Sequence, residues 1–303
     1  MPPISTYAIN VPVVDLRSSP FPHQGGYELD LQQESQLLYG ERVKVHEAKA
    51  GWLLVEAIEQ ERFRKETGWT GYPGWIKEVA VLPQESSPTY NLVVQVPWAS
   101  VRSEPALESP LLLELCMGTH LEGMEESGDW WMIRLLDGKL GAVLRKDVRL
   151  ITPSQALNRP LLLKDGHKLL HHPYLWGGRS VYHPYNRSFI TSCDCSGLVS
   201  LLYRLQGFPL PRDAHDQYLK SSLKNGKELE IGDLIFLAKS DRPERMNHVM
   251  LYAGEDSILD ANNTDKKIVI TLSEKRFGKS LKLLKNGERV GNFFFHFGAA
   301  LKG

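Results

Sequence analysis

The first half of the chain contains an internal repeat, which narrows the folds open to it. Residues 11–20 read VPVVDLRSSP and residues 96–105 read VPWASVRSEP, so five of the ten positions are identical without a gap. Each copy consists of short apolar runs separated by glycine, proline and charged turns, which predicts short strands closed into a small barrel. The similarity continues in three further pairs of segments: 38–40 with 116–118, 51–55 with 129–133, and 74–76 with 141–143.

The second half has a different pattern, centred on a cysteine. Cys195 follows Asp194 and precedes apolar residues at helical spacing as far as Leu205. Aspartate is a preferred N-cap, and the free amides and positive dipole end of a helix stabilise an anion such as a thiolate. We therefore predict that Cys195 is a nucleophile. The alternative is that it is a small buried hydrophobic residue, the commoner role of a cysteine before an apolar helix.

A base and its orienting partner follow downstream. His248 begins an apolar, strand-like run, and a second such run over residues 257–263 contains Asp260. A carboxylate there could accept a hydrogen bond from the far nitrogen of His248, which would give a nucleophile, a base and an orienter in that chain order. Asn262 is close enough in sequence to be the alternative orienter.

The other candidate ligands do not predict a metal site. Cys193 and Cys195 form a Cys-x-Cys pair, but a structural zinc site normally needs four ligands. Cys116 is distant, and His171 and His172 precede a Trp-Gly-Gly segment where a surface or cleft-wall position is the simpler explanation. We expect no metal and no cofactor. Three cysteines without paired spacing favour a reactive thiol over a disulfide framework.

From about residue 165 onward the motifs resemble those of the NlpC/P60 cysteine peptidases of bacterial cell-wall metabolism, which have a papain-like fold. Residues 174–178 (YLWGG) are similar to the family's Tyr-x-Trp-Gly-Gly, 194–197 (DCSG) to its Asp-Cys-Ser-Gly, 232–234 (GDL) to its Gly-Asp-Leu, and His248 with the next residue to its His-Val. The family's third polar residue is usually a second histidine, and the matching position here is Asp260. An aspartate can still orient an imidazole, so the resemblance implies a variant triad.

Both copies of the repeat resemble bacterial SH3-like domains, with an Arg-Ser-x-Pro opening and a glycine before an apolar strand. The second copy lacks the closing tryptophan of the first, Trp75. The resemblances together imply an α+β fold in three domains: SH3-like β-barrels at residues 1–85 and 86–152, and a papain-like peptidase domain at 153–303.

Two barrels ahead of such a domain resemble a subgroup, the gamma-D-glutamyl diamino-acid peptidases, in which the first barrel closes one side of the cleft. Only a peptide with a free N-terminal L-alanine then fits. Ala214 departs from the pattern, because the family often has a serine there that contacts the glutamate. The substrate-binding residues that the resemblance implies are Tyr72, Glu34, Asp194, Ser196, Arg212 and Trp176.

The roles of five of these residues follow from the same resemblance. Tyr72 would face the cleft from the first barrel, and Asp194 would accept the alanine amine, with Glu34 as a second anion. Ser196 and Arg212 would hold the D-glutamyl carboxylate, since the forked guanidinium suits that group.

Charge and composition bear on partners and location. The 36 basic and 36 acidic residues balance, and the pI is near 7.2, so no nucleic acid or anionic membrane is expected as a partner. No run approaches the roughly 18 apolar residues of a membrane span, and the N-terminal residues lack a signal-peptide pattern. We expect a cytoplasmic monomer whose partners are peptidoglycan-derived peptides.

The function implied is that of a cysteine endopeptidase that cleaves the bond between gamma-D-glutamate and a diamino acid, meso-diaminopimelate, in such peptides. Two alternatives remain open: a peptidoglycan-binding module that has lost activity, and an acyltransferase or amidase on the same scaffold. The sequence does not distinguish among diamino acids, or between recycling and wall remodelling.

Overall fold

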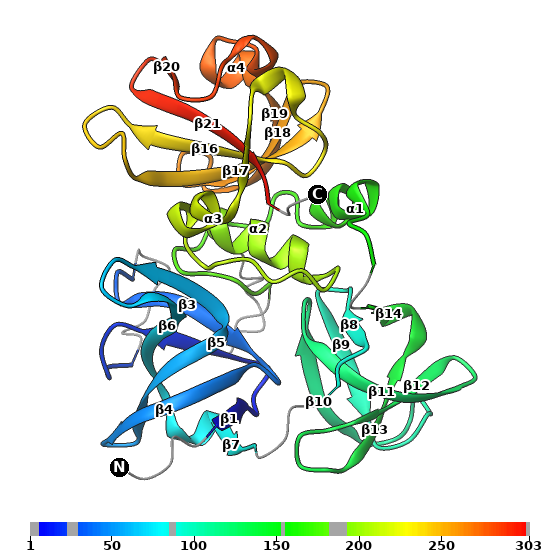
Figure 1. Cartoon of the computed structure of the whole chain (residues 1–303). Coiled ribbons are helices and arrows are strands. Elements are labelled where there is room, and N and C mark those ends of the chain that lie inside the picture. Colours follow the sequence, from blue (N-terminus) through cyan, green and yellow to red (C-terminus); the bar gives the residue numbers. More distant parts are fainter. Residues whose placement is uncertain (1–5, 23–29, 85–88, 153–154, 182–192, 301–303) are drawn as a thin grey trace.

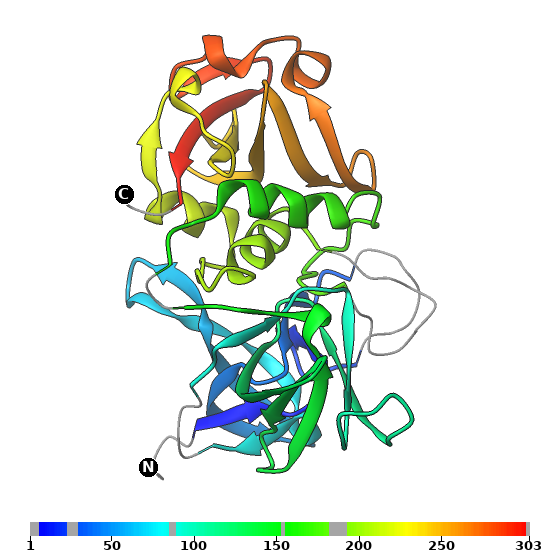
Figure 2. The ribbon, with the colours of Figure 1, turned by 90° about the vertical axis from the view of Figure 1, so that its right-hand side faces the viewer.

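A computed structural model of the chain describes residues 6–22, 30–84, 89–152, 155–181 and 193–300. Three sheets organise these residues. Two β domains lie side by side, and an α+β domain lies across both of them (Figures 1 and 2).

The first β domain is a seven-stranded antiparallel sheet with the order β3-β2-β6-β5-β4-β1-β7. Its core is formed by apolar side chains that alternate along the strands, such as Val43, Val55 and Ile76. The longest strands, β5 and β6, form a hairpin that reaches the α+β domain (Figure 1). The elements are β1 (Thr6–Ile9), β2 (Val13–Arg17), β3 (Gln33–Leu38), β4 (Arg42–Lys49), β5 (Trp52–Arg64), β6 (Gly68–Lys77), η1 (Glu78–Ala80) and β7 (Val81–Pro83).

The second β domain repeats this topology strand for strand, in the order β10-β9-β13-β12-β11-β8-β14. The register shift is repeated as well: it falls between Val45 and Glu47 in the first domain and between Gly123 and Glu125 in the second. The predicted duplication of a small β fold is therefore confirmed. The elements are β8 (Leu92–Val94), β9 (Trp98–Arg102), β10 (Leu111–Cys116), β11 (His120–Ser127), β12 (Trp130–Arg134), β13 (Leu140–Leu144), η2 (Arg145–Asp147) and β14 (Val148–Leu150).

The α+β domain contains the third sheet, with the order β15-β21-β16-β17-β18-β19, and β20 pairs with β21. Alternate side chains of β16 point to opposite faces: Phe236 packs toward α2, and Leu237 toward a second apolar cluster. No helix in the described ranges is long and apolar enough to cross a membrane. The helices are α1 (Arg159–Lys168), α2 (Cys195–Arg204), α3 (Ala214–Lys220), η3 (Gly226–Glu228), α4 (Ser273–Phe277) and η4 (Leu281–Leu283). The strands are β15 (Ser222–Lys224), β16 (Leu234–Lys239), β17 (Met246–Gly254), β18 (Ser257–Asn262), β19 (Lys267–Leu272), β20 (Glu288–Val290) and β21 (Phe293–Ala299).

A buried ion pair network fixes the first β domain against the α+β domain. Glu41 is 1 % exposed and lies 2.8 Å from Arg179 and 3.3 Å from Arg204. Burial would raise the pKa of Glu41, but the two guanidinium groups outweigh it and lower that pKa. Gln36 adds to the junction, because its side-chain oxygen accepts hydrogen bonds from the backbone amides of Arg179 and Ser180.

The three cysteines are free thiols in different environments. Cys116 and Cys193 are fully buried, and burial raises the pKa of each to about 12. Cys195 is only partly buried. It is therefore the one thiol of the three that a substrate can reach.

Candidate active site

Cys195 is the first residue of α2, as the capping pattern predicts. The N-cap is Asp194, whose side chain accepts a hydrogen bond of 2.7 Å from the backbone amide of Gly197. The apolar stripe that follows Cys195, including Leu198 and Leu202, packs into the core of the α+β domain. The sulfur is thereby held at the positive end of a helix that packing keeps rigid.

The Trp-Gly-Gly and Asp-Cys-Ser-Gly motifs dock on each other, which explains their glycines. The amide of Gly177, at φ +70°, donates to Asp194 at 3.0 Å, and the Asp194 amide donates to Gly178 at 3.1 Å. A Cβ on Gly197 would lie 2.1 Å from the Gly178 carbonyl oxygen, so only glycine permits this approach. Trp176, predicted as a binding residue, is 46 % exposed beside this junction.

His248 and Asp260 lie on the neighbouring strands β17 and β18. His248 Nε2 is 2.8 Å from Asp260 Oδ1, and the His248 side chain also hydrogen-bonds Cys195. Because Nε2 faces the carboxylate, Nδ1 is the ring nitrogen left for the thiol. The structure brings the predicted nucleophile, base and orienter together in the predicted order.

Two opposing influences set the pKa of His248. Burial alone would lower it, but the negative charges of Asp260 and Cys195, together with their hydrogen bonds, raise it well above its usual range. A protonated imidazole would therefore lie against the sulfur of Cys195, as a proton donor beside the predicted nucleophile.

Asp260 has two further partners. Its second oxygen, Oδ2, lies 2.8 Å from Arg276 Nη2 and accepts a 3.2 Å hydrogen bond from Asn262. Asn262, the alternative orienter, thus supports Asp260 instead of contacting His248 itself. Arg276 was not predicted, because it lies on α4 within an ordinary charged segment, SEKRF, and nothing in that segment marks it.

Arg212, predicted to hold a carboxylate, is completely buried and already binds one. Its Nη1 and Nη2 atoms lie 3.1 and 2.7 Å from the two oxygens of Asp194, Nη1 is 2.9 Å from Ser196 Oγ, and Nε is 2.8 Å from Ser35 Oγ. One of its five N–H groups, on Nη2, remains for a ligand.

Asp194 is correspondingly saturated. It accepts hydrogen bonds from the amides of Gly177 and Gly197, from Ser196 Oγ and from both Nη atoms of Arg212. A substrate amine would have to displace one of these donors. These contacts favour other carboxylates over Asp194 as acceptors for an amine.

Two such carboxylates surround the hydroxyl of Tyr72, at the junction of the first β domain and α3. The hydroxyl is 3.1 Å from Glu34 Oε2 and 3.3 Å from each oxygen of Asp213. Burial and the Asp213 charge raise the pKa of Tyr72, so its hydroxyl stays protonated. A single hydroxyl cannot neutralise two carboxylates, and the cluster is suited to a cation. Asp213 was missed, although it directly follows Arg212.

The match to protein families decides the assignment. Residues 171–284 match the model of the NlpC/P60 family. The chain contains an NlpC/P60 domain. Cys195, His248 and Asp260, the predicted nucleophile, base and orienter, all fall within the matched segment.

Known relatives extend the similarity beyond the NlpC/P60 domain. The chain is 27% identical over 251 residues to a gamma-D-glutamyl-L-lysine dipeptidyl-peptidase of Bacillus subtilis (strain 168), covering 82% of this chain and 79% of the relative. It is 27% identical over 244 residues to a protein of the same name from Bacillus cereus, covering 78% and 69%. The similarity thus includes residues of the β domains.

Solved structures support the same fold. An NlpC/P60 family protein from Bacillus cereus superposes with a TM-score of 0.76 at 21% identity, covering 96% of this chain and 98% of the other. An NlpC/P60 endopeptidase from Photobacterium damselae gives a TM-score of 0.61 at 17% identity, covering 98% and 73%. The predicted fold class, α+β with a papain-like NlpC/P60 domain after two small β domains, is confirmed.

Tyr174 lies near Cys195, the predicted nucleophile. Burial raises its pKa, and the charges of Cys195 and Asp194 raise it further. The phenol therefore remains a hydrogen-bond donor near the sulfur. It is a candidate for a second oxyanion donor, next to the backbone amide of Cys195.

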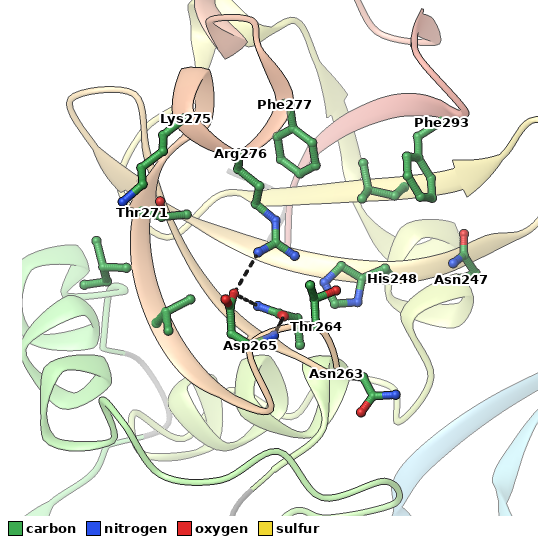
Figure 3. A pocket seen from close by; sticks show the side chains of 14 residues that line it. Asn247, His248, Asn263, Thr264, Asp265, Thr271, Lys275, Arg276, Phe277 and Phe293 are labelled. Carbon is green, nitrogen blue, oxygen red and sulfur yellow. Dashed lines mark hydrogen bonds and ion pairs between the residues drawn. The ribbon is translucent and has the colours of Figure 1, made fainter.

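A pocket of about 670 Å³ opens beside His248 and extends to α4 (Figure 3). Thr264 and Asp265 line it from the β18–β19 turn, and Lys275 and Arg276 from α4. Within the described residues, no group of three His, Cys, Asp or Glu side chains could hold a metal ion.

Proposed function

We propose that this protein is a cysteine endopeptidase that cleaves the bond between gamma-D-glutamate and a diamino acid in peptidoglycan peptides with a free N-terminal L-alanine. The similarity to the NlpC/P60 family and to the dipeptidyl-peptidases supports a peptidoglycan peptidase. The observation that carries the finer proposal is the Tyr72–Glu34–Asp213 cluster, which the first β domain completes next to the thiol-containing domain.

The cluster supplies a site for an ammonium group. Glu34 and Asp213 are half-buried and carry two negative charges that the neutral Tyr72 hydroxyl leaves uncompensated. The Arg62 guanidinium lies over the ring of Tyr72, 4.8 Å from its centroid, and does not pair with either carboxylate in the described residues. A free N-terminal amine would satisfy both acids, whereas an acetylated one would carry no charge and more bulk.

The glutamyl carboxylate has a candidate partner between this cluster and the thiol. The unused N–H of Arg212 is one donor, and the hydroxyl of Ser196, one residue after the nucleophile, becomes a second if it turns from Asp194 to the ligand. Binding of the N-terminal amine at the cluster and of the glutamyl carboxylate at Arg212 would hold the gamma-carbonyl at the sulfur. Such positioning accounts for a large part of enzymatic rate enhancement.

The reaction is an acyl transfer. The Cys195 thiolate attacks the gamma-carbonyl carbon, and the resulting oxyanion accepts hydrogen bonds from the Cys195 amide and the Tyr174 hydroxyl. His248 gives its proton to the departing amine as the C–N bond breaks, which leaves a thioester. A water molecule, deprotonated by the now neutral His248, then attacks the thioester and releases L-Ala-D-Glu and the thiolate.

The test compares the free peptide L-Ala-gamma-D-Glu-meso-diaminopimelate with its N-acetylated form, with products followed by mass spectrometry. We expect cleavage of the free peptide alone, and none by Cys195→Ala, which should still bind it. Cleavage of both peptides would keep the peptidase and reject the amine site. Cleavage of neither would favour the binding-module or the acyltransferase alternative.

The site of action forms part of the proposal. Small free peptides are the substrates that a capped cleft admits, so we propose that the protein acts on peptides released from the wall, as a monomer in the cytoplasm. Cell fractionation of the source bacterium would check the location, and sedimentation would check the oligomeric state.

A further inference from the structure

The pocket beside His248 has the position expected for the leaving side of the substrate, and this inference rests on the proposed function. His248 protonates the departing amine, so the diamino acid must extend from His248. Figures 1 and 2 place α4 on the side of the third sheet far from the first β domain, where the acyl side lies. The pocket runs from His248 to Lys275 and Arg276 of α4 (Figure 3).

Its size and lining fit one amino acid with a long side chain. About 670 Å³ lies within the range of small-ligand sites. The lining combines the apolar Val269 and Phe277 with the hydroxyls of Thr264 and Thr271. Methylene groups and a polar end are therefore both accommodated.

One cation of the pocket is committed to the triad. Arg276 lies 2.8 Å from the buried Asp260 and 3.3 Å from Asp265, so its charge is shared between two carboxylates. It cannot turn toward a ligand without leaving Asp260 uncompensated. The other cation differs: Lys275 is exposed and makes no hydrogen bond or ion pair with the described residues.

One acceptor is also available. Asp265 is 42 % exposed, and its hydrogen bonds from Asn262 and Arg276 all reach Oδ2. Its Oδ1 accepts none from the part of the chain that the structure describes. The pocket thus presents an ammonium on α4 and a carboxylate oxygen on the β18–β19 turn.

We propose that Lys275 makes this pocket selective for a diamino acid whose side chain ends in a carboxylate as well as an amine, the diaminopimelate type, over lysine. The distal carboxylate would bind Lys275, and the distal amine would bind Asp265 Oδ1. A lysine side chain supplies only the amine and would bring its ammonium close to that of Lys275. The pair therefore attracts one ligand and opposes the other.

The experiment measures kcat/KM for two tripeptides with a free L-alanine that differ only in the third residue, meso-diaminopimelate or L-lysine. We expect wild type to prefer the first. Lys275→Ala should lower kcat/KM for the diaminopimelate peptide about 10-fold, the size of one charge-assisted hydrogen bond. Lys275→Ala should raise kcat/KM for the lysine peptide roughly 2-fold, because it removes the repulsion between two ammonium groups. Lys275→Glu should invert the preference between the two peptides. Lys282→Ala, another exposed lysine without a partner in the described residues, is the matched control.

Three outcomes would overturn the inference. Equal losses on both peptides would mean that Lys275 contacts the main-chain carboxylate that both share. No effect of either Lys275 variant would remove it from the site. Cleavage of neither peptide by wild type would reject the proposed function itself, and the inference with it. Affinities of the two peptides for Cys195→Ala, measured by calorimetry, should show the same inversion with Lys275→Glu added.

Discussion

Replacing Asp260 with asparagine should inactivate the enzyme through the tautomer of His248. In the native site, Oδ2 of Asp260 receives donors from Arg276 and Asn262, while Oδ1 faces His248 Nε2. An asparagine has only one oxygen, and the two donors would hold it at the Oδ2 position. Its NH₂ group would then face Nε2, which must accept. The proton of neutral His248 would move to Nδ1, the nitrogen that has to take a proton from the thiol.

The expected loss has two parts. The imidazolium–carboxylate contact of 2.8 Å is a charge-assisted hydrogen bond, and such a bond contributes about 1.5–3 kcal/mol, or roughly 10- to 150-fold in rate. The wrong tautomer adds to this, since the same acid-to-amide change in a serine protease triad costs about 10⁴-fold. We therefore expect kcat/KM to fall by about 10³- to 10⁴-fold, with little change in KM.

A pH profile tests the electrostatic part. Asp260 raises the pKa of His248, so the imidazolium persists to higher pH in the native site. The asparagine removes that charge and lowers the pKa, so the alkaline limb of kcat/KM should move to lower pH. Residual activity at a single pH does not separate the two effects, and the profile should be recorded by a continuous assay from pH 5 to 10.

A double variant tests the tautomer. Adding Arg276→Met to Asp260→Asn removes the stronger donor at the Oδ2 position, so the amide can turn its oxygen toward Nε2. The double variant should recover about 10-fold over the single asparagine variant. If Arg276→Met lowers activity by the same factor in both backgrounds, the tautomer reasoning is refuted. Thermal unfolding of each variant would show whether loss of fold explains the result.

Three further predictions follow from contacts elsewhere. Asp213→Asn should raise KM for the free-amine peptide about 10-fold and leave kcat within about 3-fold, because an amine loses one charged acceptor; steady-state kinetics would show a different pattern if Asp213 is only structural. Gly197→Ala should destabilise the protein by about 2–4 kcal/mol, measured by urea unfolding, because its Cβ would meet the Gly178 carbonyl at 2.1 Å. Glu41→Gln should cost about 3–5 kcal/mol, since it leaves Arg179 buried without its carboxylate, and a change under 1 kcal/mol in the same measurement would contradict this.

Those parts of the fold that depend on short stretches of sequence, the repeated β domains and the start of α2, were predicted from those stretches. The repeat predicted two copies of one β fold, and the structure has the same strand order and the same bulge in both. Strand register follows from alternating burial, which repeats when the sequence repeats. The start of α2 at Cys195 was predictable for the same reason, because an N-cap and an apolar stripe act within a few residues.

The binding residues depend on contacts between distant segments, and there the sequence was insufficient. Tyr72 and Asp213 are 141 positions apart, and Arg212 and Ser35 are 177 apart. No local pattern shows that Asp194 is already saturated by Arg212 and by three other donors. Its predicted role as the amine acceptor follows from the resemblance alone, whereas the contacts favour Glu34 and Asp213.

Asp260 stands at the third position of the triad, where the family usually has a histidine. The effect of that difference depends on a second residue, Arg276. A neutral histidine there would need no counter-charge, but a fully buried carboxylate does. His248 supplies one positive charge only while it is protonated, and it gives that proton away during the reaction. Arg276, 2.8 Å from Asp260, would keep a positive charge beside the carboxylate through both half-reactions of the proposed mechanism. We therefore expect Asp260 to function together with Arg276 on α4, the two residues acting as one unit in orienting the base.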